Sequence, residues 1–485
     1  MNIKKETQRQ LSEITPLEQD FSQWYTDVVQ NGKLMMYGPA KGTMILLPNA
    51  YGIWENIQIE LNKMFKTKNV QNVNLPLFIP ESLFNREKDH IEGFNPELAA
   101  VTHVGDRKLD ERLFVRPTSE VLFAELFKNL TQSYKDLPII FNQWVNVVRW
   151  EKTTRPFLRS REFLWQEGHT IHADAKEARN LTKDMIKIYA KFLKDYLAIP
   201  TIIGKKTPHE KFAGACTTWT IEAMMKNGHA LQAGTSHYLA QNFSKAFDIS
   251  FKNTNNEDEF AYQTSWGVTT RLIGALIMTH GDNRGIIIPP RIAPIQVDIL
   301  ELFANKDQNV TLTAKKIQTA LNKKFRVRVD SSDKNPGFKA SNSEIQGVPL
   351  RIEIGPRDLA NGEVTFVRRD TLEKTQVKLE NIKEAVKKAL TDIHNNLYEV
   401  AENRLKNNIE YVYDYETFKQ KIEENKFVIA PFCCSGEAEV RIKAETGAST
   451  RCIPLSLDKP LKDAKCIFSE CSGNTGRYVV FAKAY

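Results

Sequence analysis

The chain has 485 residues, of which 41% are hydrophobic and 26% are charged, and its formal net charge is +8. This composition is ordinary for a globular protein, and the length suggests roughly two to four domains. No stretch approaches the roughly 18 apolar residues of a membrane span, and the first residues lack the apolar core of a signal peptide. We therefore expect a cytosolic protein with no membrane segment. The basic charge favours polyanionic partners only mildly.

The first half of the chain contains segments with clear local patterns. Residues 51–66 carry apolar side chains at helical spacing, which predicts an amphipathic helix, and residues 70–80 predict a short strand ended by prolines. Two strands are expected at 138–151 and 161–173, joined by a loop that carries several arginines.

The later segments predict a change of architecture. Residues 267–280 indicate a buried helix, and 285–290 a short strand whose two prolines suggest a domain boundary. Strand and helix patterns then alternate, which predicts a small α/β domain with a mostly parallel sheet. Its expected strands are 293–300, 326–330, 348–355 and 363–370, and its expected helices are 314–325 and 380–406. A third, smaller module begins near residue 411 and contains most of the cysteines.

The most informative stretch is residues 148–170, VRWEKTTRPFLRSREFLWQEGHT. Alternate residues of a strand share a face, which predicts a floor made by Phe163, Trp165, Glu167 and His169 from one strand and by Val147, Arg149 and Glu151 from the other. Aromatic walls with a carboxylate suit a small cationic ligand such as an amino acid, and arginines suit phosphate. The alternative is an exposed, salt-bridged hairpin, which the interleaved aromatic residues disfavour.

Glycine-rich phosphate loops of the common kinds are absent from the sequence. Neither GxxxxGK[ST] nor a GxGxxG after a strand occurs. If ATP binds, arginines and aromatic side chains must hold it.

Four longer motifs resemble a family. RPTSE (116–120), residues 149–170, LQAGTSHYLAQNFSKAFDISF (231–251) and AYQTSWGVTTRLIGALIMTHGD (261–282) are similar to class II prolyl-tRNA synthetases of the archaeal and eukaryotic type. The resemblance implies an α/β and α+β multidomain fold: a class II antiparallel-sheet catalytic domain over 1–288, an α/β anticodon-binding domain over 289–408, and a small C-terminal α+β, zinc-binding-like domain over 409–485. It also implies a homodimeric ligase that activates L-proline with ATP and Mg²⁺ and transfers it to tRNA(Pro).

The resemblance assigns roles to individual residues. Arg149 would bridge the proline carboxylate and the α-phosphate of ATP, Arg271 would contact the γ-phosphate, and Pro76 would lie at the dimer interface. The expected proline pocket is completed by Thr118, Glu120, Trp165, Glu167, His237 and Ser265. The remaining ATP contacts are expected from Glu151, Arg159, Ser160, Phe163, Gln232 and Thr235.

Outside the catalytic region, the resemblance suggests Arg357, Arg368 and Arg369 as anticodon contacts; a solvated strand edge is the alternative. It also suggests that Tyr485 folds back toward the catalytic domain. A non-catalytic relative that senses amino acid or RNA need not keep the arginines that hold phosphate, so their presence favours an enzyme. The aromatic walls, with Glu167 and His237, favour proline over another amino acid.

Five of the six cysteines lie between Cys433 and Cys471. Cys433, Cys466 and Cys471 are candidate zinc ligands. However, Ala438 stands where the family has another cysteine, and Cys434 is adjacent to Cys433, so we expect a metal-free fold rather than zinc. Cys452 is expected in the core.

Two other candidates are interpreted as structural. Cys216 stands where the family commonly carries an acidic residue, and its small and aromatic neighbours predict a packed thiol rather than a nucleophile. His169 and His172 lie three apart on a strand and should face opposite ways, so they are not expected to share a metal ion.

Only residues 174–260 separate the segment ending HTIHA from AYQTSWG, too few for the inserted editing domain of bacterial-type enzymes. Small apolar amino acids are hard to distinguish by binding, because a methylene contributes only about 1–3 kcal/mol. We predict that the purified chain does not hydrolyse alanyl-tRNA(Pro), measured as deacylation of labelled alanine. Rapid release of alanine would contradict this.

Overall fold

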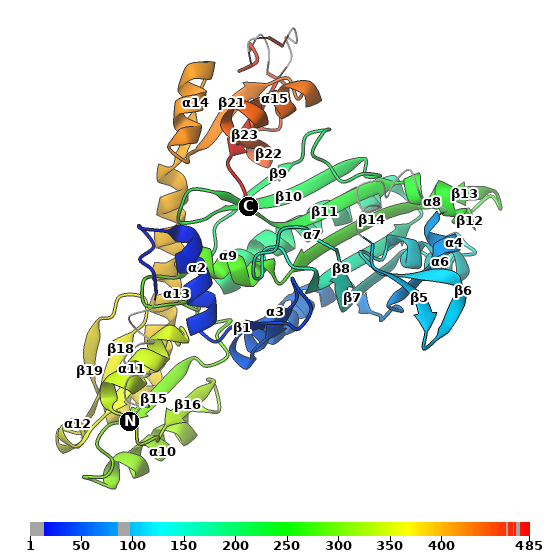
Figure 1. The fold of residues 1–485 in the computed structure, drawn as a ribbon. Helices are drawn as coiled ribbons and strands as arrows, with labels where there is room; N and C mark the ends of the chain where they lie inside the picture. Colours follow the sequence, from blue (N-terminus) through cyan, green and yellow to red (C-terminus); the bar gives the residue numbers. More distant parts are fainter. Residues whose placement is uncertain (1–13, 86–97, 462–463, 469, 472–475) are drawn as a thin grey trace.

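The computed structural model describes residues 14–85, 98–461, 464–468, 470–471 and 476–485. Three lobes follow one another along the chain (Figure 1). The central lobe contains a large antiparallel sheet, the α/β lobe lies at the lower end of the view, and the C-terminal lobe lies at the top. A large antiparallel sheet and an α/β lobe were both expected, and both are present.

The sheet of the central lobe is formed by seven strands in spatial order. They are β9 (Ile202–Lys205), β10 (Thr217–Met224), β11 (Ala230–Ala240), β14 (Tyr262–Thr269), β8 (Glu162–His172), β7 (Ile139–Val148) and β3 (Gln71–Asn72). Only the β3–β7 pair is parallel; the other neighbours are antiparallel. The predicted hairpin is confirmed, because β7 pairs with β8 over the whole length of β7, with Val147 opposite Phe163.

Several helices pack against the same hydrophobic core as this sheet. They include α2 (Phe21–Asn31), α3 (Pro48–Lys66), α7 (Ala175–Leu197) and α9 (Arg271–His280). The α7 helix is capped by Asp174, whose carboxylate accepts a hydrogen bond from the backbone N–H of Glu177, and it contacts five strands of the sheet. The helix predicted over 51–66 is confirmed as α3.

Two predictions at the end of the central lobe were wrong. The segment 267–280 is not one helix, because β14 continues to Thr269 and α9 starts only at Arg271. A continuous buried apolar run does not distinguish a strand from a helix by its pattern. Residues 285–290 form no strand. Ile286 and Ile288 are buried in the core of the central lobe and Ile287 in that of the α/β lobe, and the Ile288 N–H donates to the Gly347 carbonyl at 3.2 Å.

The α/β lobe contains a five-stranded mixed sheet. Its spatial order is β16 (Val327–Asp330), β15 (Val297–Glu301), β17 (Leu350–Ile354), β18 (Glu363–Arg368) and β19 (Lys374–Lys378), and its helices include α10 (Asn309–Leu321), α11 (Pro336–Ile345) and α13 (Ile382–Asn407). Only the two pairings made by β15 are parallel, so the expectation of a mostly parallel sheet was wrong. The short link between β18 and β19 allows only a hairpin, since a parallel crossover needs a dozen or so residues.

The C-terminal lobe extends the sheet of the central lobe. Its strands β20 (Ile409–Tyr411), β21 (Phe427–Phe432), β23 (Arg477–Ala482) and β22 (Ser449–Pro454) join β9 through antiparallel pairing of β22, which gives one sheet of eleven strands. Gly204 is required at this junction because a Cβ there would lie 2.5 Å from the Ile453 carbonyl oxygen. The sequence predicted a separate module, and this shared sheet was not expected.

Candidate active site

One cavity of about 290 Å³ is lined by every residue expected to hold ATP or proline. These residues are Thr118, Glu120, Arg149, Glu151, Arg159, Ser160, Phe163, Trp165, Glu167, Gln232, Thr235, His237, Ser265 and Arg271. Alternation along β11 explains why Thr235 and His237 face the cavity together: Ser236 Oγ, between them, donates to the Thr182 carbonyl of α7 on the opposite face of the sheet. The structure brings the residues together, and their individual roles remain predictions.

The aromatic wall comes from the start of β8. The rings of Phe163 and Trp165 lie 6.2 Å apart and nearly perpendicular, and the Arg149 guanidinium lies 5.6 and 5.3 Å from their centroids. The expectation that Arg149 and Glu151 continue the strand face was wrong. The β7 strand ends at Val148, and Glu151 N–H donates to the Arg149 carbonyl in a turn. Arg149 therefore reaches the aromatic wall from the beginning of the loop.

Positive charge is concentrated at one end of the cavity. Arg271 is partly buried, and its guanidinium donates to the Leu158 carbonyl at 3.3 and 3.2 Å. Burial lowers the pKa of Arg271 to about 10, and the nearby cations Arg149 and Arg159 act in the same direction. Arg271 still carries its charge at neutral pH, so this end of the cavity is suited to an anion.

The loop arginines divide into two kinds. Arg159 lines the cavity. Arg155 is held between two aromatic rings, 5.0 Å from the centroid of Tyr25 and 5.2 Å from that of Tyr485, while Arg161 lies 4.3 Å from the ring of Trp150. Arg155 and Arg161 therefore brace the loop.

The expected return of Tyr485 is confirmed, because the tyrosine contacts the central lobe. Its backbone N–H donates to the Ala230 carbonyl at 3.2 Å, and its hydroxyl accepts from Asn227 Nδ2 at 2.8 Å. Through its ring contact with Arg155, this tyrosine contributes directly to the position of the loop.

The other end of the cavity combines a carboxylate with unpartnered polar atoms. Thr118 Oγ1 donates to Glu120 Oε2, where α6 (Glu120–Leu130) begins. Ser265 Oγ and Trp165 Nε1 are buried and have no hydrogen-bond partner among the described residues. Because buried polar groups are normally satisfied, these two atoms indicate where a polar ligand would complete the site.

His237 contributes a neutral imidazole to this end. Its Nδ1 lies 3.0 Å from Thr218 Oγ1, and its ring lies 4.8 Å from that of Phe212. Burial, with a smaller effect from His169, lowers the pKa of His237 to about 3. His237 can therefore exchange hydrogen bonds with a ligand at neutral pH without adding charge.

The sequence did not identify several residues that line the cavity, including Lys206, Glu210, Phe212 and Thr218. The Lys206 ammonium lies 3.1 Å from the fully buried carboxylate of Glu222. Arg451 of the C-terminal lobe donates to the other oxygen of Glu222 at 3.0 and 2.8 Å. The polar run KKTPHEKF after β9 was a possible signal for Lys206, whereas nothing local in the sequence connects Arg451 to this wall.

Comparisons with known proteins agree with this geometry. Residues 101–280 match the tRNA synthetase class II core domain (G, H, P, S and T), 292–389 the anticodon binding domain, and 415–485 the C-terminal domain of prolyl-tRNA synthetase. The proline–tRNA ligase of Mycoplasmopsis synoviae (strain 53) is 63% identical over 98% of this chain and 100% of the relative. Those of Mycoplasmopsis pulmonis (strain UAB CTIP) and Mycoplasma mobile (strain ATCC 43663 / 163K / NCTC 11711) are 60% and 56% identical, with 98% and 100% of this chain covered and all of each relative. The chain belongs to the proline–tRNA ligase family. The whole-length coverage agrees with the expected absence of an inserted editing domain.

The arginines expected to contact the anticodon differ in their surroundings. Arg357 is exposed, and Arg368 forms a fork with Asp370 at 3.0 and 2.6 Å. Arg369 is only 3% exposed, and its guanidinium binds the Asp282 carboxylate at 2.7 and 2.6 Å. The expectation that Arg369 faces tRNA was wrong, because its charge is used inside the junction between the α/β lobe and the catalytic lobe.

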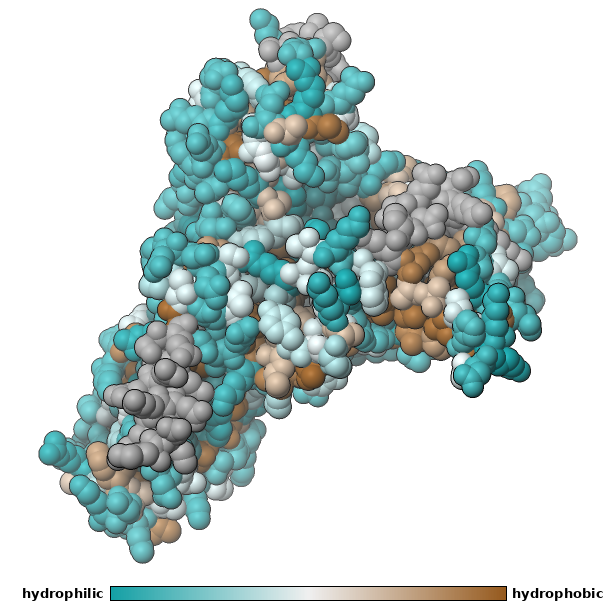
Figure 2. Space-filling model, in the orientation of Figure 1, coloured by the Kyte–Doolittle hydropathy of each residue, from teal (hydrophilic) through white to brown (hydrophobic). Residues whose placement is uncertain are grey.

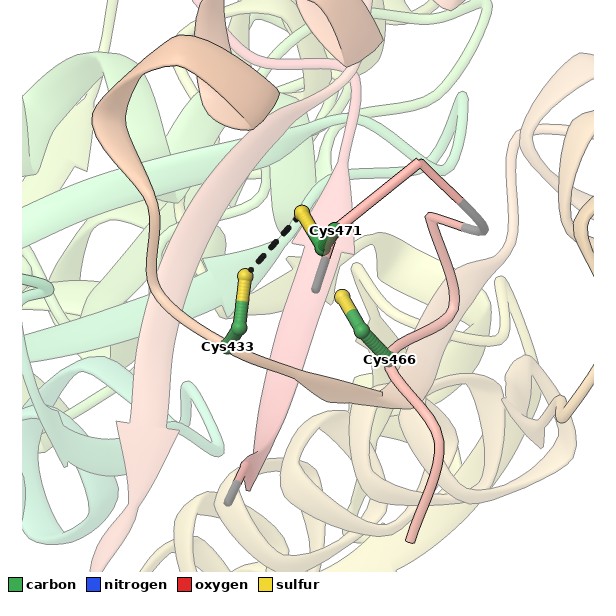
Figure 3. A group of neighbouring side chains, drawn as sticks. All are labelled: Cys433, Cys466 and Cys471. Carbon is green, nitrogen blue, oxygen red and sulfur yellow. Dashed lines mark hydrogen bonds between the residues drawn. The ribbon is translucent and has the colours of Figure 1, made fainter. Parts of the chain in front are cut away.

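Three cysteines of the C-terminal lobe converge on one point (Figure 3). Cys433 follows β21, and its sulfur lies 3.2 Å from that of Cys471, with Cys466 alongside. The three sulfurs all lie within 4.8 Å of one another. Cys434 is not part of this group, and Cys452 is fully buried, as expected.

Two minor predictions had different outcomes. Cys216 is exposed, so the expected packed thiol was wrong; it immediately precedes β10, and its neighbour Ala215 takes the buried position. His169 contacts Glu167 at 3.1 Å and His172 contacts Glu177 at 3.0 Å, so the two histidines have separate partners, as expected.

Among the helices that the structure describes, none combines the length and the apolar character of a membrane span.

The low pKa of His237 makes stability depend on pH. Below pH 6.5 the unfolded chain gains a proton at this histidine that the folded chain does not, so stability is lost as the pH falls. We expect the His237→Gln variant to lose about 1.4 kcal/mol less free energy of unfolding than the wild type between pH 7.5 and 5.5. Urea unfolding at both pH values measures this. The exposed His103→Gln variant is the control and should behave as the wild type; equal losses in all three proteins would contradict the prediction.

Proposed function

We infer that the chain is an ATP-dependent proline–tRNA ligase, which activates L-proline as prolyl-adenylate and transfers it to the 3′ end of tRNA. The observation that carries this conclusion is the cavity itself: a cationic end and a carboxylate-bearing end are joined by an aromatic wall with Arg149 beside it. A sensor of amino acid or RNA would not need Arg149, Arg159 and Arg271 together in one cavity.

The proposed chemistry depends mainly on positioning and charge. The proline carboxylate attacks the α-phosphorus of MgATP, and pyrophosphate leaves. A terminal ribose hydroxyl of tRNA then attacks the carbonyl of the adenylate and releases AMP. Phosphoryl and nucleotidyl transfers of this kind need aligned reactants and neutralised phosphate charge more than a covalent contribution from the protein.

The residues of the cavity divide between these tasks. We assign Arg149 to the junction of the proline carboxylate and the α-phosphate, and Arg271 with Arg159 to the outer phosphates. Glu120 offsets the positive charge of the proline imino group, which must be paired when it is desolvated. The adenosine and remaining ATP contacts are assigned to Glu151, Ser160, Phe163, Gln232 and Thr235, and the rest of the proline pocket to Thr118, Trp165, His237 and Ser265.

The proposal extends to the domains and to tRNA. We assign residues 1–288 to catalysis, 289–408 to anticodon binding and 409–485 to the C-terminal domain. Exposed Arg357 remains a candidate anticodon contact, and Arg368 could join it only by leaving Asp370. Unpaired anticodon bases would be recognised there by stacking and by hydrogen bonds to their edges.

A homodimer in the cytoplasm is also part of the proposal. Large apolar side chains are exposed on β1 (Met35–Tyr37), β2 (Met44–Leu46) and α3, namely Met36, Tyr37, Ile45, Tyr51 and Ile59. Apolar surface is visible where the central lobe carries β1 and α3 (Figure 2). Pro76, expected at the interface, is exposed. A second copy of the chain would cover this surface.

The cysteine group supports zinc as a structural ligand. Three thiolates within 4.8 Å of one another supply three of the four ligands of a tetrahedral zinc site, and Ala438 leaves the fourth position to another ligand. This differs from the metal-free fold expected from the sequence, and we therefore propose it as a hypothesis to be tested.

Arg149 provides the test of the catalytic assignment. We expect Arg149→Ala to lower kcat/KM for proline-dependent ATP–pyrophosphate exchange at least about 100-fold, because it removes charge from the reacting phosphate. Exchange should be measured with each of the twenty amino acids, and the exposed Arg107→Ala variant is the control. Activity of Arg149→Ala within a few fold of wild type would refute the role of Arg149. Absence of exchange with proline in the wild type would refute the function.

Metal analysis of the purified protein tests the zinc proposal. We expect about one zinc per chain, lost in Cys466→Ser and retained in Cys434→Ser, because only the first change removes a ligand. A wild-type protein that holds no metal when purified without chelators would contradict the proposal.

A further inference from the structure

The carboxylate of Glu167 is fully engaged by neighbouring protein groups. Glu167 is 2% exposed. Its Oε1 accepts hydrogen bonds from Ser119 Oγ and, at 2.6 Å, from Gln143 Nε2. Its Oε2 lies 3.1 Å from Ser119 N–H and 3.1 Å from His169 Nε2. A carboxylate with both oxygens in use is poorly placed to pair with a ligand as well.

Gln143 connects this carboxylate to two other segments. It is fully buried on β7, directly opposite Glu167 in the β7–β8 register. The same Nε2 lies 2.8 Å from Ser119 Oγ, and Oε1 accepts the Leu75 N–H at 3.0 Å. The hydrogen bonds of Gln143 therefore join the sheet, the loop at Ser119 and the segment that precedes β4 (Phe78–Pro80).

Ser119 lies between the two residues that face the cavity from this loop. It is fully buried, and both its backbone N–H and its hydroxyl are bound to Glu167. One residue earlier than Thr118, the Pro117 carbonyl accepts from Arg149 Nε at 3.0 Å. The loop is thus fixed on both sides of Thr118, and the direction of Glu120 follows from the position of Ser119.

We propose that Gln143 and Glu167 are positioning residues that set the affinity for proline by holding Ser119, so that Thr118 and Glu120 meet the imino group. This rests on the proposed function, and it changes the role of Glu167 from a direct proline contact to a support behind the contacts. Neither residue hydrogen-bonds to Arg159 or Arg271 of the phosphate end, so the larger effect is expected on proline rather than on ATP.

The test is the Gln143→Met variant of the full chain in ATP–pyrophosphate exchange, with proline and ATP titrated separately. We expect the KM for proline to rise about tenfold or more. The buried Glu167 carboxylate loses the hydrogen bond donated by Gln143, and the loop at Ser119 shifts. The KM for ATP, and kcat at saturating proline, should stay within about twofold. A purely structural role would change both KM values.

Asn142→Leu is the matched control. Asn142 is the neighbouring residue on β7, is equally buried, and forms its hydrogen bond with Asn72 on the other face of the sheet. We expect its KM for proline to match that of the wild type. If Gln143→Met leaves the KM for proline unchanged, or changes it in step with the KM for ATP and with the control, the positioning role is overturned.

Ser119→Ala tests the same contact from the other side and serves if Gln143→Met does not fold. It should show the same split between the two KM values. The KM for proline of the double variant, Gln143→Met with Ser119→Ala, should not exceed the higher of the two single-variant values, because both changes release the same loop. Fully additive effects would overturn the proposal. A wild type without proline-dependent exchange would overturn the proposed function itself, whereas an active wild type with an unaffected Gln143→Met variant overturns only this inference.

Discussion

The cavity depends on holding a partly buried arginine charged and oriented. Arg271 is the first residue of α9, and backbone carbonyls of Leu158 and Gln232 accept from its guanidinium. Carbonyl oxygens orient the guanidinium without cancelling its charge, and the amino end of a helix adds positive potential of its own. The charge therefore remains available for an incoming anion, and the desolvation cost is visible in the lowered pKa of Arg271.

The C-terminal lobe takes part in maintaining this arrangement. Its strand β22 pairs with β9, its Arg451 neutralises buried Glu222, and its Tyr485 stacks on Arg155 of the loop. These contacts act at three separate places of the central lobe. A buried carboxylate such as Glu222 is costly without a partner, so the wall that carries Lys206 depends on a residue from another lobe.

Sequence patterns predicted the parts of the site that depend on local periodicity. Alternation along β7 and β8 placed Phe163 and Trp165 on one face, because side chains of a strand alternate whatever the strand is packed against. The resemblance supplied further residues that line the cavity, including His237 and Arg271 from distant segments. Local pattern could not distinguish the end of β14 from the start of α9, since both are buried and apolar.

The features that were missed depend on long-range partners. Arg369 looks like a surface residue of a strand edge until Asp282 of another lobe is placed beside it, and nothing local in the sequence shows that Ser119 and Gln143 both bind the Glu167 carboxylate. The pairing of β22 with β9 has a consequence for the integrity of the fold. Strand β9 would otherwise be an unprotected edge able to recruit strands from other molecules, so the C-terminal lobe also shields the catalytic lobe from aggregation.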